Sequence, residues 1–403
     1  MKTLAKALLI IAALAIFAPA VYAEPIAEPQ EIEDEENQGE AFEDDEIDAE
    51  IERLASELKL EAWQSYFDEN GASFSLGFEA VDEMLVHYAE NSAAGDPQNV
   101  FKPLYALIKN RLSGALGTVA SLTAAALITG IPSAVFGKED RRFLTMALSI
   151  GSVLLTAGLF SSLCAAAVKC IERISGFCEA CLPVMTVLMT ASGSAASAGA
   201  LQPMMLFISS GVVFFLKKVI LPLIIAGAAI GIADSVCEDG RLTELVKLIQ
   251  KAVKWLIGLA AAVFFGVCVI KGLTVSAHDG IAVRTAKYAA DKLFPSAGGF
   301  LGGTADTMLG CAMLVKNGAG ITAIIIMAGI VAKPLITIGV GALAFRFAAA
   351  LSSFAADRSV VNLLSGAGET ASCLFGATAI AGAMFMLTIL VFLAAGGVSA
   401  GLW

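Results

Sequence analysis

Residues Ala180 to Leu216 read ACLPVMTVLMTASGSAASAGALQPMMLFISSGVVFFL, a run of 37 residues without a charged side chain. A helix needs roughly 20 apolar residues to cross the ~30 Å hydrocarbon core of a bilayer. Gly193, Gly199 and Pro203 interrupt the run, so the stretch predicts two helices, one of which is re-entrant. The chain is therefore expected to enter a membrane here.

Apolar windows of the same kind fill the rest of the chain after its first quarter. They cover residues 112–137, 143–168, 219–233, 255–270, 298–315, 318–332, 335–354 and 370–402. Several are shorter than a straight span requires, which predicts half-helices ending near Lys217-Lys218 and Lys333-Pro334. The sequence thus predicts an all-α, polytopic membrane helix bundle over residues 111–403, with about seven to eight spans, some broken or re-entrant.

Composition supports this class. Hydrophobic residues make up 57% of the 403 residues, charged residues only 16%, and the mean hydropathy is +0.79. A soluble domain has about 25% charged residues, so most soluble enzymes, coiled coils and disordered proteins are excluded. Residues 24–96 hold 24 acidic and 2 basic side chains, whereas the later part is net positive with its cations spread between apolar runs. That spread is typical of loops flanking membrane spans and not of a nucleic-acid-binding patch.

The N-terminus resembles a targeting signal. Lys2 and Lys6 precede an apolar core at residues 7–17, which is too short to span, and Val21-Tyr22-Ala23 is a cleavage-site pattern. Residues 1–23 are therefore predicted to be a signal peptide cleaved after Ala23; an uncleaved anchor is the alternative. Either would export the acidic head, in which residues 24–50 are expected to be a disordered tail and 51–110 a small extracytoplasmic helical region.

Two segments are expected on the cytoplasmic side. With the head outside, Lys138–Arg142 must be inside, in agreement with the positive-inside rule. Arg241–Lys254 predicts an amphipathic helix that lies on the membrane surface, docks a partner or packs on the bundle. Prolines recur 112 residues apart, Pro183 with Pro295 and Pro222 with Pro334, which suggests two repeats at about 143–254 and 255–403.

The sequence carries no motif of a known enzyme chemistry. It has only two histidines, no Walker A sequence and no His-Glu-x-x-His, so we expect no ATP hydrolysis, zinc protease activity, metal or cofactor. All eight cysteines lie after the head and suit helix packing, although Cys178-Glu-Ala-Cys181 leaves a redox or metal role open. Asp306 interrupts a neutral segment and pairs, in one interpretation, with Lys316 or Lys333 along a polar path or assembly contact. In the other, these charges lie at the membrane interface.

Residues Gly272 to Gly320 read GLTVSAHDGIAVRTAKYAADKLFPSAGGFLGGTADTMLGCAMLVKNGAG. This stretch resembles the stage III sporulation protein AE family. The resemblance is carried by an Asp after an apolar segment, a basic helix, Pro with Gly-Gly, an Asp among small residues, and Lys-Asn-x-x-Gly. These positions are Asp279, Arg284, Lys287, Tyr288, Pro295, Gly298, Gly299, Asp306, Lys316, Asn317 and Gly320. Ser296-Ala297 departs from the pattern, where a second apolar residue is expected.

The resemblance implies a non-enzymatic scaffold or channel component of a secretion-like sporulation complex needed for late forespore gene expression. It places the protein in the mother-cell membrane around the forespore, among membrane lipid, a secretion-type ATPase and intermembrane ring proteins, without nucleic acid or cofactors. Homo-oligomerisation is left open. An independent secondary transporter for a small solute is the alternative. The candidate polar-path or assembly residues are Asp306, Lys316, Asn317, Lys333, Asp279, Arg284 and Lys287.

Overall fold

A computed structural model describes residues 44–58, 60–74, 78, 80–90, 114–131, 138–236, 242–293 and 298–395. Within these ranges the side chains of some stretches are not described, among them those of 269–293 and 298–307. The expected signal peptide at 1–23 lies outside the described residues, as does the acidic tail up to residue 43.

Three short helices form the head: α2 (Asp44–Glu57), α3 (Glu61–Phe74) and α4 (Val81–Glu90). Their apolar residues recur at helical spacing and are buried, among them Ile51, Trp63, Met84 and Leu85. α2 starts at Asp44, within the segment 24–50 expected to be a disordered tail. The extracytoplasmic location of the region 51–110 stays a prediction.

Much longer helices follow. They are α7 (Lys138–Ala191), α8 (Ala195–Phe215), the π-helical turn η1 (Leu216–Ile220), α9 (Leu221–Val236), α10 (Thr243–Leu293), α11 (Gly298–Ser352) and α12 (Arg358–Ala394), preceded by the shorter helix Gly114–Ile128. At a rise of 1.5 Å per residue, α7 and α11 are each about 80 Å long. They are far longer than one bilayer is thick.

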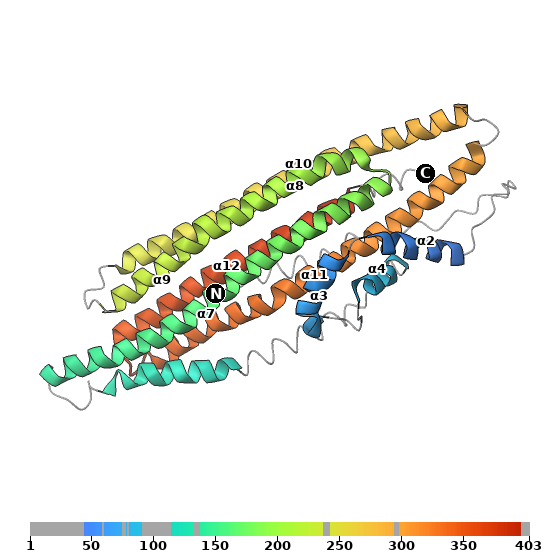
Figure 1. Ribbon diagram of the computed structural model, residues 1–403. Helices are drawn as coiled ribbons and strands as arrows, with labels where there is room; N and C mark the ends of the chain where they lie inside the picture. Colours follow the sequence, from blue (N-terminus) through green and yellow to red (C-terminus); the bar gives the residue numbers. More distant parts are fainter. Residues whose placement is uncertain are drawn as a thin grey trace, which may run out of the picture.

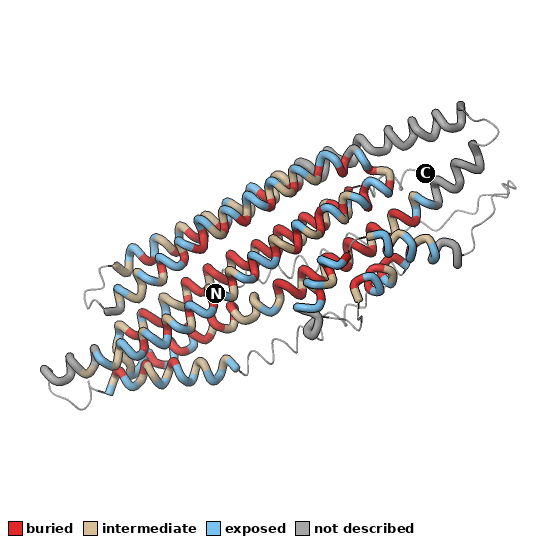
Figure 2. The backbone as a smooth tube through the Cα atoms, viewed as in Figure 1, coloured by how far each residue is buried: buried red, intermediate tan, exposed pale blue. Residues whose placement is uncertain are grey.

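The long helices lie nearly side by side in two layers (Figure 1). The inner layer contains α7, α11 and α12, which pack most extensively on one another, and the outer layer contains α10 with the rod formed by α8, η1 and α9. The head packs on α11, with α3 also contacting α7. Buried residues concentrate along the inner layer, whereas the outer layer shows more exposed positions (Figure 2).

The described residues contain five helices long and apolar enough to cross a membrane, against the seven to eight expected spans. The predicted break near Gly193 is confirmed. Gly193 has φ 82°, and the Ser194 amide donates to the Met189 carbonyl at 2.9 Å, which closes the end of α7. The all-helical class with membrane-spanning candidates is confirmed, and within the described residues the apolar helices are longer than the predicted windows.

The half-helices predicted at Lys217-Lys218 and Lys333-Pro334 are continuous helices instead. Lys217 and Lys218 lie in η1 in the middle of one rod, and Pro334 lies inside α11. Proline removes the donor that would bond the carbonyl four residues earlier, which here is Ile330. That carbonyl accepts the Cys170 thiol at 4.0 Å, so a neighbouring helix partly replaces the lost bond.

The segment Arg241–Lys254 has three interpretations on sequence alone. From Thr243 it forms the first turns of α10, which continues without a break to Leu293. Val246, Gln250 and Val253 of this segment are buried, and α10 packs against α9 and α12. Packing on the bundle is therefore the interpretation that the fold supports.

Candidate functional site

A cluster of three charges joins three helices at the level of the membrane-spanning segments. Glu369 of α12 accepts a hydrogen bond from Lys254 of α10 and another from Arg346 of α11, whose Nη2 lies 2.6 Å from Glu369 Oε2. All three side chains are about two-thirds or more buried. Charges at membrane depth are costly unless they pair, and this cluster pairs one carboxylate with two cations.

Small residues make the cluster possible. A Cβ on Gly368 would lie 2.8 Å from Arg346 Cγ, so a glycine here lets the arginine stem cross α12 closely. One turn away, Gln250 of α10 donates to Thr370 Oγ1 at 3.0 Å, and Thr370 in turn donates to the Gly366 carbonyl at 2.9 Å. These bonds fasten the outer layer to the inner one.

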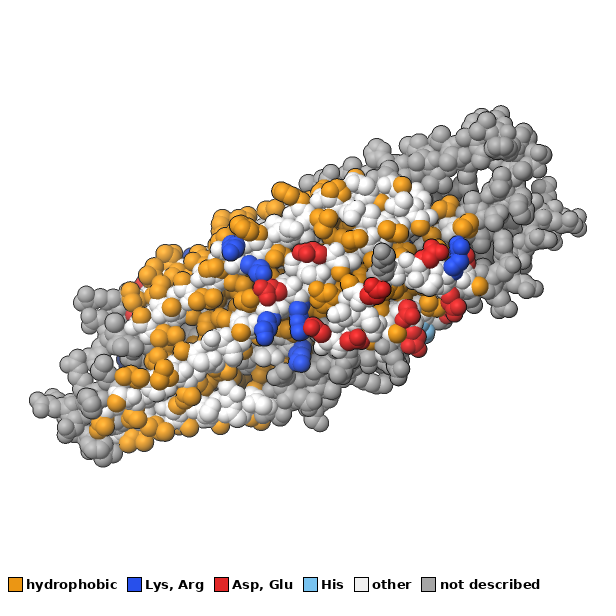
Figure 3. All heavy atoms as spheres, viewed as in Figure 1, with side chains coloured by type: hydrophobic (Ala, Val, Ile, Leu, Met, Phe, Trp, Pro, Cys, Tyr) orange, Lys and Arg blue, Asp and Glu red, His pale blue; other side chains and the backbone are white. Residues whose placement is uncertain are grey.

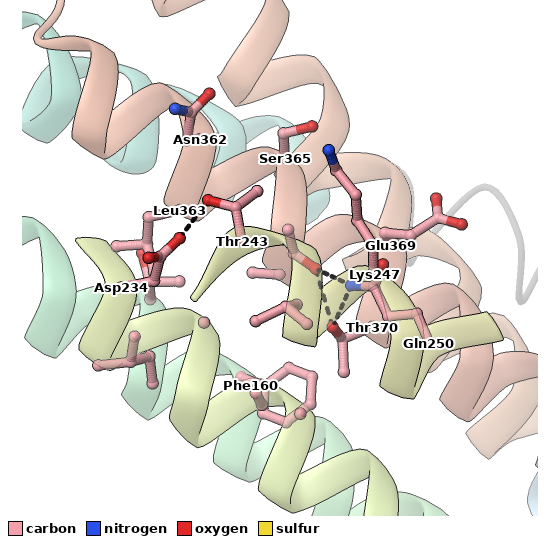
Figure 4. A pocket seen from close by; sticks show the side chains of 18 of the residues that line it. Phe160, Asp234, Thr243, Lys247, Gln250, Asn362, Leu363, Ser365, Glu369 and Thr370 are labelled. Carbon is pink, nitrogen blue, oxygen red and sulfur yellow. Dashed lines mark hydrogen bonds between the residues drawn. The ribbon is translucent and has the colours of Figure 1, made fainter. Parts of the chain in front are cut away.

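A polar cavity of about 770 Å³ adjoins this cluster (Figure 4). Helices α7, α9, α10 and α12 all contribute to its walls. Its lining includes Thr156, Phe160, Gly227, Gly231, Asp234, Thr243, Lys247, Gln250, Arg358, Asn362, Ser365, Glu369 and Thr370. Apolar residues and glycines share this lining with hydroxyl, amide and charged side chains, so the cavity offers some hydrogen bonds to a polar solute between the two layers.

Asp234 of α9 also lines the cavity. Its carboxylate accepts from the Leu242 amide at 2.9 Å and from the Thr243 hydroxyl, and so it satisfies donors at the N-terminus of α10. Figure 4 shows Asp234 directed toward Thr243, with Glu369 on the opposite side of the view. Asp234 therefore has a structural partner, and Glu369 is the carboxylate held by cations from two other helices.

The arrangement does not resemble a catalytic or metal site. Among the described residues, no three His, Cys, Asp or Glu side chains are close enough to hold a metal ion. Cys178 and Cys181 are buried within α7, where they pack as small apolar residues. What the geometry offers is a cavity of mixed lining and a charge cluster that links the layers.

The residues predicted from sequence lie elsewhere. Lys316 is only 1% exposed, and its Nζ donates to the Ala395 carbonyl at 3.1 Å, at the C-terminus of α12. A cation is favourable there because the helix dipole places negative charge at that end. Asn317 is half-buried, and Lys333 is exposed.

The other four predicted residues fall on side chains that are not described. Asp279, Arg284 and Lys287 lie on α10, and Asp306 lies on α11. One continuous helix carries Asp306, Lys316 and Lys333, which separates Asp306 from the two lysines by about 15 and 40 Å along its axis. Neither lysine of the same chain is within reach of a direct ion pair with Asp306.

Sequence reasoning missed Glu369, Arg346 and Lys254 as a group. Lys254 and Glu369 each stand at the edge of an apolar window and were compatible with a membrane interface, whereas Arg346 lies inside the window 335–354. Only the packing of α10, α11 and α12 brings the three together. The local signal was a carboxylate directly after Gly366-Ala-Gly368, where small residues permit close helix approach.

Comparison with known proteins supplies the relationship. A family model described as stage III sporulation protein AE matches residues 83–396. The stage III sporulation protein AE of Bacillus subtilis (strain 168) is 25% identical over 358 residues, covering 86% of this chain and 88% of that protein. No solved structure matches. The matched region begins within α4 and covers all five spanning helices and the charge cluster, and the chain therefore belongs to the stage III sporulation protein AE family.

Proposed function

We propose that the protein is a non-enzymatic scaffold or channel component of a secretion-like sporulation complex connecting mother cell and forespore. In this proposal it lies in the mother-cell membrane around the forespore, with its head extracytoplasmic, and late forespore gene expression requires it. Membership in a family named for sporulation supports the process. The apolar helices support the membrane location.

The observation that carries a channel or scaffold role is the polar cavity between the layers. An inert membrane anchor would fill this volume with apolar side chains, because buried polar groups without partners are destabilising. Here hydroxyl, amide and charged side chains, Glu369 among them, line it together with apolar residues. The end of the bundle bearing Lys138, Thr243 and Arg358 would meet the secretion-type ATPase, and the head would meet the intermembrane ring proteins.

Deletion in a sporulating host tests the proposal. We expect engulfment to finish, a late forespore reporter to stay silent, and heat-resistant spores to be lost. Re-expression of the wild-type chain should restore them. Normal spore counts in the deletion strain would refute the assignment.

Complementation with E369Q tests the cavity. We expect the variant to accumulate normally in the membrane yet restore fewer spores, because Lys254 and Arg346 lose their shared partner. E69Q is a control outside the cavity, since Glu69 pairs with Arg173 and both side chains are about half exposed. Equal rescue by both variants would argue for a purely structural scaffold.

The charge cluster at membrane depth also keeps the secondary transporter as a second candidate, because transporters place ionisable groups at such positions. A gene cluster with a secretion ATPase and ring-forming proteins favours the complex, whereas a solitary gene beside metabolic genes favours the transporter. Asp306, Asn317 and the charges Asp279, Arg284 and Lys287 remain proposed path or assembly contacts. Full activity of D306N would remove Asp306 from that set.

A further inference from the structure

Exposed lysines from three parts of the bundle lie at one level along its axis. They are Lys169 of α7, Lys218 of η1 and Lys333 of α11, and we call them the lysine belt. Two contacts fix the level: Glu172 pairs with Lys217 at 2.9 Å, and the Cys170 thiol reaches the Ile330 carbonyl at 4.0 Å. When residues are counted from these contacts at a rise of 1.5 Å each, the three lysines lie within about 8 Å of one another along the bundle axis.

On one side of the belt the bundle has the length and surface of a bilayer-spanning slab. From the belt to the ends near residues 143, 234 and 352, the helices run about 16–26 residues, or roughly 24–39 Å, which brackets a ~30 Å hydrocarbon core. Large apolar side chains face outward in this slab, among them Leu154, Ile225 and Phe347. We call it the membrane half.

The other side of the belt has similar length but differs on one face, where the head packs. There Trp63 donates to the Ala180 carbonyl at 3.3 Å and Arg173 pairs with Glu69 at 3.1 Å. Head residues Glu61 and Asp68 remain exposed. Exposed carboxylates would be expelled from hydrocarbon, so lipid does not cover the head face of this head-side half.

Charged side chains gather across the middle of the molecule, with apolar surface continuing toward the end away from the head (Figure 3). Lysines at such a boundary keep their stems on apolar surface and extend their ammonium groups into the headgroup layer. Phosphates of anionic lipids attract cations close to the membrane surface.

We propose that the lysine belt binds anionic phospholipid headgroups on the head side of the membrane, and that the head-side half of the bundle projects beyond the bilayer. The proposal requires only that the protein is membrane-inserted. It is independent of the sporulation role, so either can fail without the other.

The first test measures depth with two matched positions. Leu154 in the membrane half is 67% exposed and Phe207 in the head-side half is 81% exposed, so both offer accessible sites on helices. The full-length variants L154C and F207C are placed in lipid nanodiscs and treated with a charged maleimide. Nanodiscs give the reagent access to both faces of the bilayer. We expect F207C to react at least tenfold faster than L154C. In denaturant the two should react equally, and the parent chain provides the background of native cysteines.

Equal protection of both positions, or faster reaction of L154C, would overturn the placement of the bilayer.

The second test measures lipid retention. The full chain and a variant with Lys169, Lys218 and Lys333 all changed to Gln are purified from mixed phosphatidylglycerol and phosphatidylcholine. Native mass spectrometry compares the lipid bound to the two proteins. We expect at least a twofold loss of bound phosphatidylglycerol.

The same three lysines changed to Arg form the control, because this variant preserves charge and should keep the lipid. Undiminished phosphatidylglycerol in the Gln variant would overturn the lipid-binding role. If the triple Gln variant does not elute as a single species, the three single variants replace it. Each single variant should then lose part of the lipid, and three wild-type results would refute the proposal.

Discussion

The two halves of the bundle are built from the same long helices but treat their polar groups differently. In the membrane half, Glu369, Arg346 and Lys254 pair with one another beside a cavity between the layers. In the head-side half, the head covers α7 and α11, and the buried Lys316 is held by a helix end. The polar groups of the membrane half thus pair across three helices, whereas the head-side half holds a buried cation at a helix end and carries a separate small domain on one face.

The largest effect is expected from a substitution that weakens the packing of the head on the head-side half. Trp63 is fully buried, its ring centroid lies 5.7 Å from that of Phe177, and its indole donates to Ala180. W63A should cost about 3–5 kcal/mol of the free energy of unfolding, the range for a buried aromatic side chain. Thermal unfolding in detergent measures it. W255A is the control, because Trp255 is 66% exposed and its loss should be within about 0.5 kcal/mol. Similar losses for both would contradict the docking.

A smaller effect is expected where α4 crosses α11. A Cβ on Gly318 would lie 2.6 Å from the Leu85 carbonyl oxygen and 2.8 Å from the Ala89 nitrogen, and neither backbone atom moves aside easily. G318A should therefore destabilise the head by about 1–3 kcal/mol and increase its cleavage by protease. G310A is the matched control on the same helix, since a Cβ on Gly310 would meet no atom within 4 Å. Indistinguishable protease profiles would show that the close approach is unimportant.

The charge cluster should contribute less, because solvent reaches about a third of Glu369 and Lys254. E369Q is expected to lower the free energy of unfolding by about 1–2 kcal/mol, since two cations remain without their shared carboxylate. E244Q should change it by less than about 0.5 kcal/mol, because that pair is exposed. Urea or thermal unfolding in detergent distinguishes them. An unchanged midpoint for E369Q would mean that water already screens the cluster.

The smallest effect concerns pH. Burial raises the pKa of Tyr88 in the head, because the phenolate loses hydration there. A folded pKa above the unfolded value of about 10 means that stability is lost as pH rises through 10 and beyond. Y88F should show a shallower fall in unfolding temperature between about pH 9 and 11. Parallel curves for the two proteins would refute this contribution.

Local sequence patterns predicted the helical class, the apolar windows and the turn at Gly193, because each depends on neighbouring residues. They failed at Pro334 and at Lys217-Lys218, where tertiary contacts decide. The Cys170 thiol donates to the Ile330 carbonyl, which Pro334 leaves without its helical donor. Lys217 of η1 pairs with Glu172 of α7. Neither contact is visible in a window of one helix.

The candidate site shows the same limit more sharply. Sequence reasoning identifies Lys316 as unusual, yet its partner is a carbonyl 79 residues later, not Asp306. Glu369 meets residues 23 and 115 positions earlier in the chain. Such a cluster depends on which helices are neighbours, and apolar windows do not specify neighbours.

The π-helical turn η1 sets a limit on how the length of this chain can vary. Across it, the rod changes its inner neighbour: α8 packs mainly on α7, and α9 mainly on α12. A π-turn arises when a helix accommodates one extra residue, and each residue turns a helix by about 100°. Because the turn absorbs that extra residue, deleting one residue from Leu216–Ile220 would leave a regular α-helix with the contact face of α9 still on α12. A deletion elsewhere in the rod would rotate that face by about 100°. Relatives that keep this packing should therefore tolerate a single-residue deletion in the turn far better than one elsewhere in the rod.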